Sequence, residues 1–339
     1  MNGETADWER ERRALLERRI SELGLDIRGS PLEPLVARLY DELAAKGLVF
    51  RPRVYLSDEW GCPSDVPLIG VPFYLADRRL ARLEEERSDH IEGEAEAMKY
   101  LRHEAGHAFN YAYRLYDRGD WREMFGPYSR PYRERYRADP FSRDHVRHIL
   151  GWYAQKHPDE DFAESFAVWL TPEIDWRAEY AYWPALRKLE YVERVMREVG
   201  GAAPDPPVLA EEHLPVDAMH YTVEEHYREA ERSIPLTDER HFDGDLRTIF
   251  RGDADAGSAA AFLRAHRGEL VRRMAYWSGE PPGIVRAFLE FLAQRAEALE
   301  LRAGGREAST LIELTAFGTA VLVNYRYTDV LGARPETQP

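Results

Sequence analysis

The segment LRHEAGHAFN, residues 101–110, places two histidines four positions apart and a glutamate directly after the first. In an α-helix, His103 and His107 share a face and can direct two imidazole nitrogens at one metal ion. Glu104 then points roughly 100° further round the helix, where a carboxylate can hold a metal-bound water without being a ligand. The flanking stretches EAEAMKYL and AFNYAYRL have helical periodicity. A chain with this spacing is therefore expected to build its site on a helix through residues 101–110.

A zinc ion needs a third protein ligand and an open position for water. The segment HPDEDFAESFAVWL offers Glu160 and Glu164 at i and i+4, interleaved with small and aromatic residues. A carboxylate pair on a half-buried helix needs a cation, so one glutamate can bind the metal while the other accepts the outer N–H of a ligating histidine. Asp159 and Asp161 are alternative ligands, and the i+4 relation to Glu164 favours Glu160.

HEAGHAFNYAYRL followed by GWYAQKHPDEDFAESFAVWL resembles the gluzincin peptidases, in particular a bacterial family of zinc-binding metallopeptidases. The layout is also similar to the catalytic domain of anthrax lethal factor. The resemblance implies a zincin-like fold with zinc bound by His103, His107 and Glu160. It covers about 70 residues, from the start of the first segment to the end of the second, and the C-terminal residues add nothing to it.

The same resemblance implies roles for the residues around the ligands. Glu104 becomes the general base, and Glu164 supports a ligating histidine. Tyr153 stands seven residues before Glu160, at the position of a tyrosine that stabilises the oxyanion. The implied function is hydrolysis of a peptide or protein substrate through a zinc-activated water, with Zn²⁺ as cofactor. Hydrolysis of a non-peptide amide uses the same chemistry and stays open.

Other residues near these segments allow two interpretations each. The basic, aromatic run YSRPYRERYR, residues 128–137, is either a solvated loop or a border of the cleft that selects acidic substrate residues. His145 and His148 either pack in the fold or assist the oxyanion in place of Tyr153. Cys62, the single cysteine, is expected to be a half-buried small residue, because nothing near it in sequence would lower its thiol pKa.

The sequence predicts a mostly helical α+β fold. Two runs rich in Val, Phe and Tyr, residues 48–60 and 66–75, predict strands that pair as a hairpin, and the hairpin at 49–75 is expected to offer an edge to an extended peptide. Helical patterns cover residues 6–23, 31–47, 78–117 with a break near Gly93, 144–153, 158–171 and the region up to 200, and residues 118–143 are expected to form a long connection.

The clearest linker is GGAAPDPP, residues 200–207. We therefore expect an N-terminal helical segment at 1–47, a zincin-like metallopeptidase domain at 48–200, a linker at 201–209 and an all-α C-terminal domain at 210–339. In an alternative interpretation, the C-terminal helical domain binds a protein partner and the metal fold is latent or structural. The intact Glu104 argues against that alternative, since a protein that has lost its catalytic activity does not need a general base.

The chain of 339 residues has 46 basic and 61 acidic residues, which gives a net charge of −15. This charge argues against nucleic-acid binding and against adhesion to anionic membranes. No apolar run is long enough to cross a bilayer, and the charged N-terminus lacks the apolar core of a secretory signal. A lone cysteine precludes an intrachain disulfide. These features predict a cytoplasmic protein.

Overall fold

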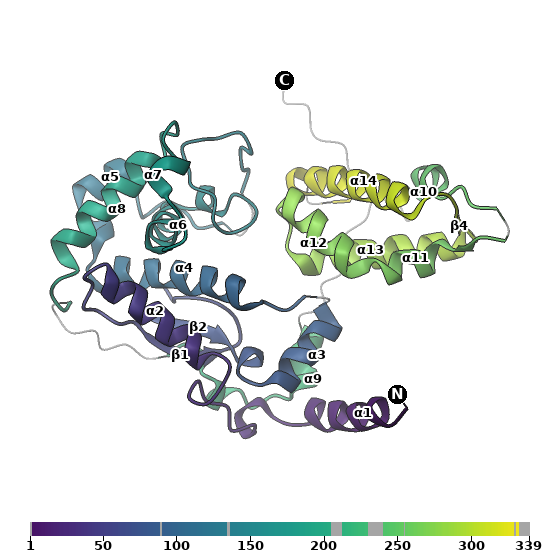
Figure 1. Cartoon of the computed structure of the whole chain (residues 1–339), viewed down its shortest axis with the longest axis horizontal. Helices are drawn as coiled ribbons and strands as arrows, with labels where there is room; N and C mark the ends of the chain where they lie inside the picture. Colours follow the sequence, from purple (N-terminus) through teal and green to yellow (C-terminus); the bar gives the residue numbers. More distant parts are fainter. Residues whose placement is uncertain are drawn as a thin grey trace. The chain divides into compact units, whose positions relative to one another are not determined.

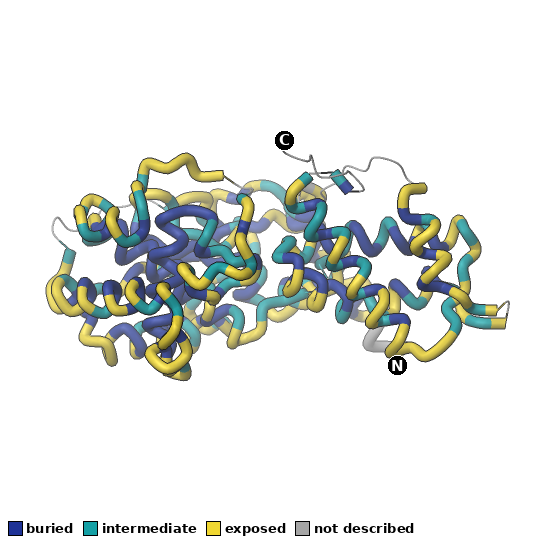
Figure 2. Tube along the Cα trace, turned by 90° about the horizontal axis from the view of Figure 1, so that it is seen from above, coloured by how far each residue is buried: buried dark blue, intermediate teal, exposed yellow. Residues whose placement is uncertain are grey.

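The computed structural model describes residues 2–88, 90–133, 136–204, 212–229, 240–253, 255–328 and 330–331. The chain divides into two compact units. Unit 1 comprises residues 1–83 and 92–228, and unit 2 comprises residues 84–91 and 229–339. Each unit has its own group of buried residues (Figure 2).

This division differs from the predicted domain boundaries. Residues 205–209 of the predicted linker lie outside the described residues, whereas 201–204 and 212–228 belong to unit 1. The later segment returns to the N-terminal region, where the Ile20 N–H donates to the Tyr221 carbonyl at 3.1 Å and the Ser21 N–H to the Met219 carbonyl at 3.0 Å. The N-terminal helical segment at 1–47 is likewise part of unit 1.

Helices dominate the described residues, which confirms the predicted mostly helical content with small sheets. The helices up to the boundary between the units are α1 (Asn2–Leu16), α2 (Glu33–Ala45), α3 (Arg78–Ser88), α4 (Glu94–Ala112), α5 (Gly119–Phe125), α6 (Pro158–Leu170), α7 (Trp176–Glu179), α8 (Leu186–Val199) and α9 (Val223–Glu229). No helix among the described residues is both long and apolar enough to span a bilayer.

Helix α4 is the central element of unit 1 (Figure 1). It packs against α6 on one side and against α2 and strand β2 on the other. Gly106 faces α6 so closely that an added Cβ would stand 2.8 Å from the Cα of Ala163 and 3.1 Å from the Cβ of Phe166. The missing side chain therefore lets the two helices approach at the level of HEAGH.

The sheet of unit 1 is parallel, so the predicted hairpin is wrong. Strand β1 (Arg53–Ser57) pairs with β2 (Leu68–Pro72) in one parallel register. Residues 58–67 carry the chain back to the start of the sheet instead of closing a tight turn, and they pass through Asp65, which has a left-handed φ of 62°. Gly61 also forms an isolated antiparallel bridge with Gly70. Parallel pairing requires the chain to return to the same end of the sheet, and residues 58–67 make this return over a path shorter than most crossovers.

Two further expectations differ from the structure. Residues 144–152 contain no helix, and at their end Gly151 and Trp152 have left-handed φ angles of 84° and 56°. A short 3₁₀ helix, η4 (Tyr153–Gln155), follows them. Within the predicted connection 118–143, residues 119–125 form α5.

The described part of unit 2 is almost entirely helical. Besides residues 84–88 of α3, its helices are α10 (Asp243–Ile249), α11 (Ala259–Ala265), α12 (Arg267–Ser278), α13 (Pro282–Ala298) and α14 (Glu307–Thr328). The short strands β3 (Gly257–Ser258) and β4 (Arg302–Ala303) pair in antiparallel fashion. Its apolar core includes Phe242, Leu270, Phe288 and Leu314. Residues 210–211, 230–239, 254, 329 and 332–339 of the predicted C-terminal domain lie outside the described residues.

Candidate metal centre

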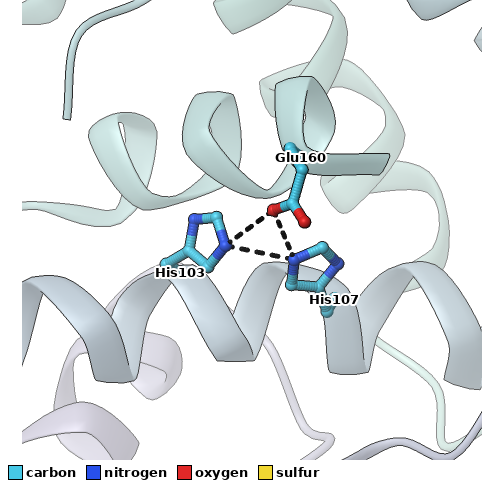
Figure 3. A group of neighbouring side chains, drawn as sticks. All are labelled: His103, His107 and Glu160. Carbon is cyan, nitrogen blue, oxygen red and sulfur yellow. Dashed lines mark hydrogen bonds and ion pairs between the residues drawn. The ribbon is translucent and has the colours of Figure 1, made fainter. Parts of the chain in front are cut away.

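Two histidines of α4 and one glutamate of α6 point at a common position (Figure 3). The Nε2 atoms of His103 and His107 each lie 3.1 Å from Oε2 of Glu160, and 3.1 Å from each other. All these side chains are buried, and their donor atoms lie within 4.8 Å of one another. Two imidazoles and a carboxylate are common metal ligands, so the group could hold a metal ion.

The outer nitrogens of both histidines face carboxylates. Nδ1 of His103 lies 2.9 Å from Oε1 of Glu164, whose other oxygen accepts the Ile149 N–H at 2.9 Å. Nδ1 of His107 lies 3.0 Å from Oδ2 of Asp159. The hydrogen bond between Glu164 and Nδ1 of His103 favours the tautomer with its proton there, and this leaves the lone pair of Nε2 directed at the shared position. The arrangement therefore suits a cation.

Asp159 is itself fixed from α4. It accepts hydrogen bonds from the Asn110 amide at 2.7 Å and from the Tyr111 hydroxyl at 2.5 Å. Sequence reasoning considered Asp159 only as an alternative ligand and missed Asn110 and Tyr111. Their signal was available, because they follow His107 at i+3 and i+4 and share its side of the helix.

Asp161, the other alternative ligand, lies away from the metal-binding group. Its carboxylate accepts a hydrogen bond from Nζ of Lys188 at 2.6 Å. Burial raises the pKa of Asp161 to about 7, although Lys188 opposes this shift. Nothing in these contacts directs its oxygens toward His103 or His107.

Glu104 lines a cavity of about 490 Å³ together with the three candidate ligands. Its side chain is buried, and it makes no hydrogen bond or ion pair with any residue that the structure describes. Burial raises the pKa of its carboxyl group, while the neighbouring His103 and His107 act in the opposite direction. A buried carboxylate that faces a cavity, with a pKa above its usual value, is a better proton acceptor than an ordinary glutamate.

In the metal-free molecule the two candidate histidine ligands hold their protons tightly, whereas Glu160 is ionised. Burial alone would lower the pKa of His103, but its hydrogen bonds to Glu160 and Glu164 raise it to about 9. Burial would raise the pKa of Glu160, but His107 and His103 hold it well below its usual range. A metal ion at this position would replace protons on the histidines, as is general for imidazole ligands.

Two tyrosines meet beside Glu160. The Tyr132 hydroxyl donates a hydrogen bond to Oε1 of Glu160 at 2.6 Å. The Tyr153 hydroxyl lies 3.3 Å from that of Tyr132, and its ring centroid is 5.6 Å from that of His103. Burial and the charge of Glu160 raise the pKa of Tyr153, so its phenol keeps its proton. Sequence reasoning identified Tyr153 but missed the contact of Tyr132.

The run at 128–137 borders the cavity, which was one of its two interpretations. Tyr128, Arg130 and Tyr132 line the cavity, whereas residues 134–135 lie outside the described part of the chain. His145 and His148 do not line it. Nε2 of His148 lies 3.1 Å from the carbonyl oxygen of Lys99, which is a packing contact.

Cys62 also lines the cavity, where its thiol lies 3.2 Å from the carbonyl oxygen of Val66. Burial, reinforced by the negative charges of Glu104 and Asp159, raises the pKa of Cys62 well above its usual value. A thiol in this setting is a poor nucleophile, in line with its expected packing role.

No protein-family model matches the chain, and neither a curated protein nor a solved structure was found to be similar to it. The gluzincin resemblance stays a prediction, and the chemistry of the centre has to be argued from its geometry.

Proposed function

We propose that the chain is a zinc-dependent peptidase of the gluzincin type, with a zincin-like catalytic region in unit 1. The proposal depends on one observation: Nε2 of His103, Nε2 of His107 and Oε2 of Glu160 converge in the cavity that Glu104 lines. This donor set is typical of catalytic zinc sites, which keep one position open. Bound zinc would supply a water that ionises near neutral pH and a positive charge for the substrate carbonyl.

Side chains of the protein carry out the remaining steps of the proposed reaction. Glu104 accepts the proton of the attacking water and passes it to the leaving amine. Its raised pKa supports both halves of this transfer. The Tyr153 phenol, which stays protonated, donates a hydrogen bond to the oxyanion that forms at the scissile carbonyl.

A peptide or protein substrate fits the walls of the cavity. Residues 59–62 line it and include Gly61, which extends the sheet beyond β2 through its bridge to Gly70. Backbone at a sheet edge can pair with an extended peptide. In this proposal the segment 59–62 takes the role that the sequence assigned to the edge of a hairpin.

The test measures metal content and cleavage separately. Zinc per chain is determined for wild type, His103→Ala and Glu104→Gln, and each protein is screened against a peptide library. We expect His103→Ala to lose zinc, and Glu104→Gln to keep zinc while cleavage falls by about 10²–10⁴-fold, because the base is gone and the ligands remain. Glu94→Gln, at an exposed position in the first turn of the same helix, is the matched control and should behave as wild type.

Two results would contradict the proposal: a wild-type protein without zinc, or a Glu104→Gln variant that cleaves as fast as wild type. A wild type that binds zinc and cleaves nothing would favour the alternative. In that alternative the metal fold is latent or structural, and the C-terminal helical domain binds a protein partner. Cleavage of amides other than peptides would keep the mechanism and change the substrate class.

A further inference from the structure

We propose that Tyr132 is a positioning residue that holds the Glu160 carboxylate in its metal-binding orientation. This inference rests on the proposed metal centre. It concerns the outer oxygen of Glu160, which no part of the proposed mechanism uses.

The two oxygens of Glu160 have separate partners. Oε2 lies 3.1 Å from the Nε2 atoms of both histidines, whereas Oε1 accepts the Tyr132 hydroxyl at 2.6 Å. The last torsion of a glutamate side chain is broad, so an unrestrained carboxylate would rotate and exchange its oxygens. A donor fixed on Oε1 leaves Oε2 directed at the shared position. Outer hydrogen bonds of this kind commonly orient metal ligands.

Lys156, Tyr153, Tyr132 and Glu160 form a short chain of polar contacts. The groups at its two ends determine the direction of each hydrogen bond. Lys156 Nζ lies 3.4 Å from the Tyr153 hydroxyl, which lies 3.3 Å from the Tyr132 hydroxyl. An ammonium group only donates, and an ionised carboxylate only accepts. In the molecule without substrate, the Tyr132 proton therefore points to Glu160 and the Tyr153 proton points to the Tyr132 oxygen. To donate to the oxyanion in the proposed reaction, the Tyr153 hydroxyl has to turn away from Tyr132.

The Tyr132 ring is held in place without its hydroxyl. Although the residue is 49% exposed, Lys156 Nζ lies 4.4 Å from its ring centroid, and the His157 ring lies 5.4 Å from it. Lys156 and His157 directly precede α6, whose first turn carries Glu160. A phenylalanine at position 132 would keep these ring contacts and remove the hydroxyl, which is the donor to the Glu160 carboxylate and the partner of the Tyr153 hydroxyl.

The experiment compares the zinc affinity of wild type, Tyr132→Phe, Tyr153→Phe and Tyr136→Phe by competition with a chromophoric chelator. We expect Tyr132→Phe to bind zinc roughly tenfold more weakly, because the ligand carboxylate loses its restraint. Tyr153→Phe keeps the Tyr132–Glu160 bond and should stay close to wild type. Tyr136→Phe is the matched control, since the Tyr136 hydroxyl donates to the Gly151 carbonyl at 2.7 Å, away from Glu160.

Thermal unfolding of the metal-free variants checks that none has lost its fold. Equal zinc affinities for wild type and Tyr132→Phe would overturn the inference and leave the proposed function standing. An equal loss in Tyr136→Phe would also overturn it, because the effect would then come from the loop as a whole. A wild type that binds no zinc would overturn the proposed function and this inference together.

Discussion

At the scale of single residues, neighbouring acids on the first turn of α6 differ in chemistry because they face different partners. Asp159 faces the outer nitrogen of His107, Glu160 faces the inner nitrogens, and Asp161 pairs with Lys188. Consecutive helical positions point about 100° apart, so each acid meets a different neighbour. Residue type alone does not reveal a role here, whereas the direction of the side chain does.

His145, which does not line the cavity, predicts a pH dependence of stability. Burial, together with the charges of Lys188 and Arg130, lowers the pKa of His145 to about 4, although Asp144 acts in the opposite direction. Asp161 lies 3.8 Å from the ring but is already paired with Lys188. An unfolded histidine titrates near 6.5, so the unfolded state takes up this proton first. The free energy of unfolding should therefore fall as the pH decreases from about 6.5 to 4.

The measurement is urea unfolding of the metal-free protein between pH 7 and pH 4, for wild type and His145→Gln. Between pH 7 and pH 4, the free energy of unfolding should fall less in the variant than in wild type. The difference should be on the order of 1 kcal/mol, after allowance for solvent screening at a partly exposed ring. Chelator in every sample removes any contribution from bound metal. Parallel pH profiles for the two proteins would show that His145 stays protonatable in the folded state.

At the scale of elements, the sequence predicted the helices that carry the site but not the segments between them. Helix α4 begins directly after Gly93, where a break was expected, and α6 ends before Thr171, as predicted. These signals are local, because caps and periodicity lie within the segment itself. Residues 144–153 showed helical periodicity too, yet the Ile149 N–H bonds to Glu164 on α6, a long-range contact that periodicity does not contain.

The strand pairing shows the same limit. The composition of residues 53–57 and 68–72 identified both strands, but parallel or antiparallel pairing depends on the path of the connection. Likewise the residue types and the i,i+4 spacings suggested His103, His107 and Glu160, whereas the contact of Tyr132 with Glu160 depends on how a loop folds over the site.

Gly106 predicts how sensitive the centre is to the separation of its two helices. In Gly106→Ala the new Cβ would meet the Ala163 backbone at 2.8 Å, so α6 has to move away from α4. Overpacking of this kind typically costs about 1–3 kcal/mol, against a gain of at most about 1 kcal/mol in helix propensity. We expect net destabilisation in urea unfolding and weaker zinc binding, because Glu160 moves with α6.

Gly119→Ala is the control for this variant. An added Cβ at Gly119 meets nothing within 4 Å, and its φ is not left-handed. Its stability and zinc affinity should stay near those of wild type. A Gly106→Ala protein with wild-type stability and affinity would show that the contact between α4 and α6 adapts without displacing the ligands.

At the scale of the whole molecule, the division into units could be predicted only in part from the sequence. The Gly- and Pro-rich stretch near residue 200 marked a change, but residues 212–228 belong to unit 1 because they pair with residues near Ile20. The composition of a segment depends only on its own residues, so it does not predict which distant segment the chain will pack against. The metal-binding group lies within unit 1, whereas the core of unit 2 is built from its own helices.

This separation predicts that zinc stabilises one unit and not the other. A ligand stabilises the folded state that binds it, by about 2.7 kcal/mol at a hundredfold excess over its dissociation constant. Calorimetry of the full chain should show two transitions, and zinc should raise the midpoint of one. In His103→Ala that shift should vanish, while the zinc-independent transition stays where it is. If both transitions moved together in wild type, the two units would unfold cooperatively, and the energy of metal binding would be distributed over the entire chain instead of the region around α4 and α6.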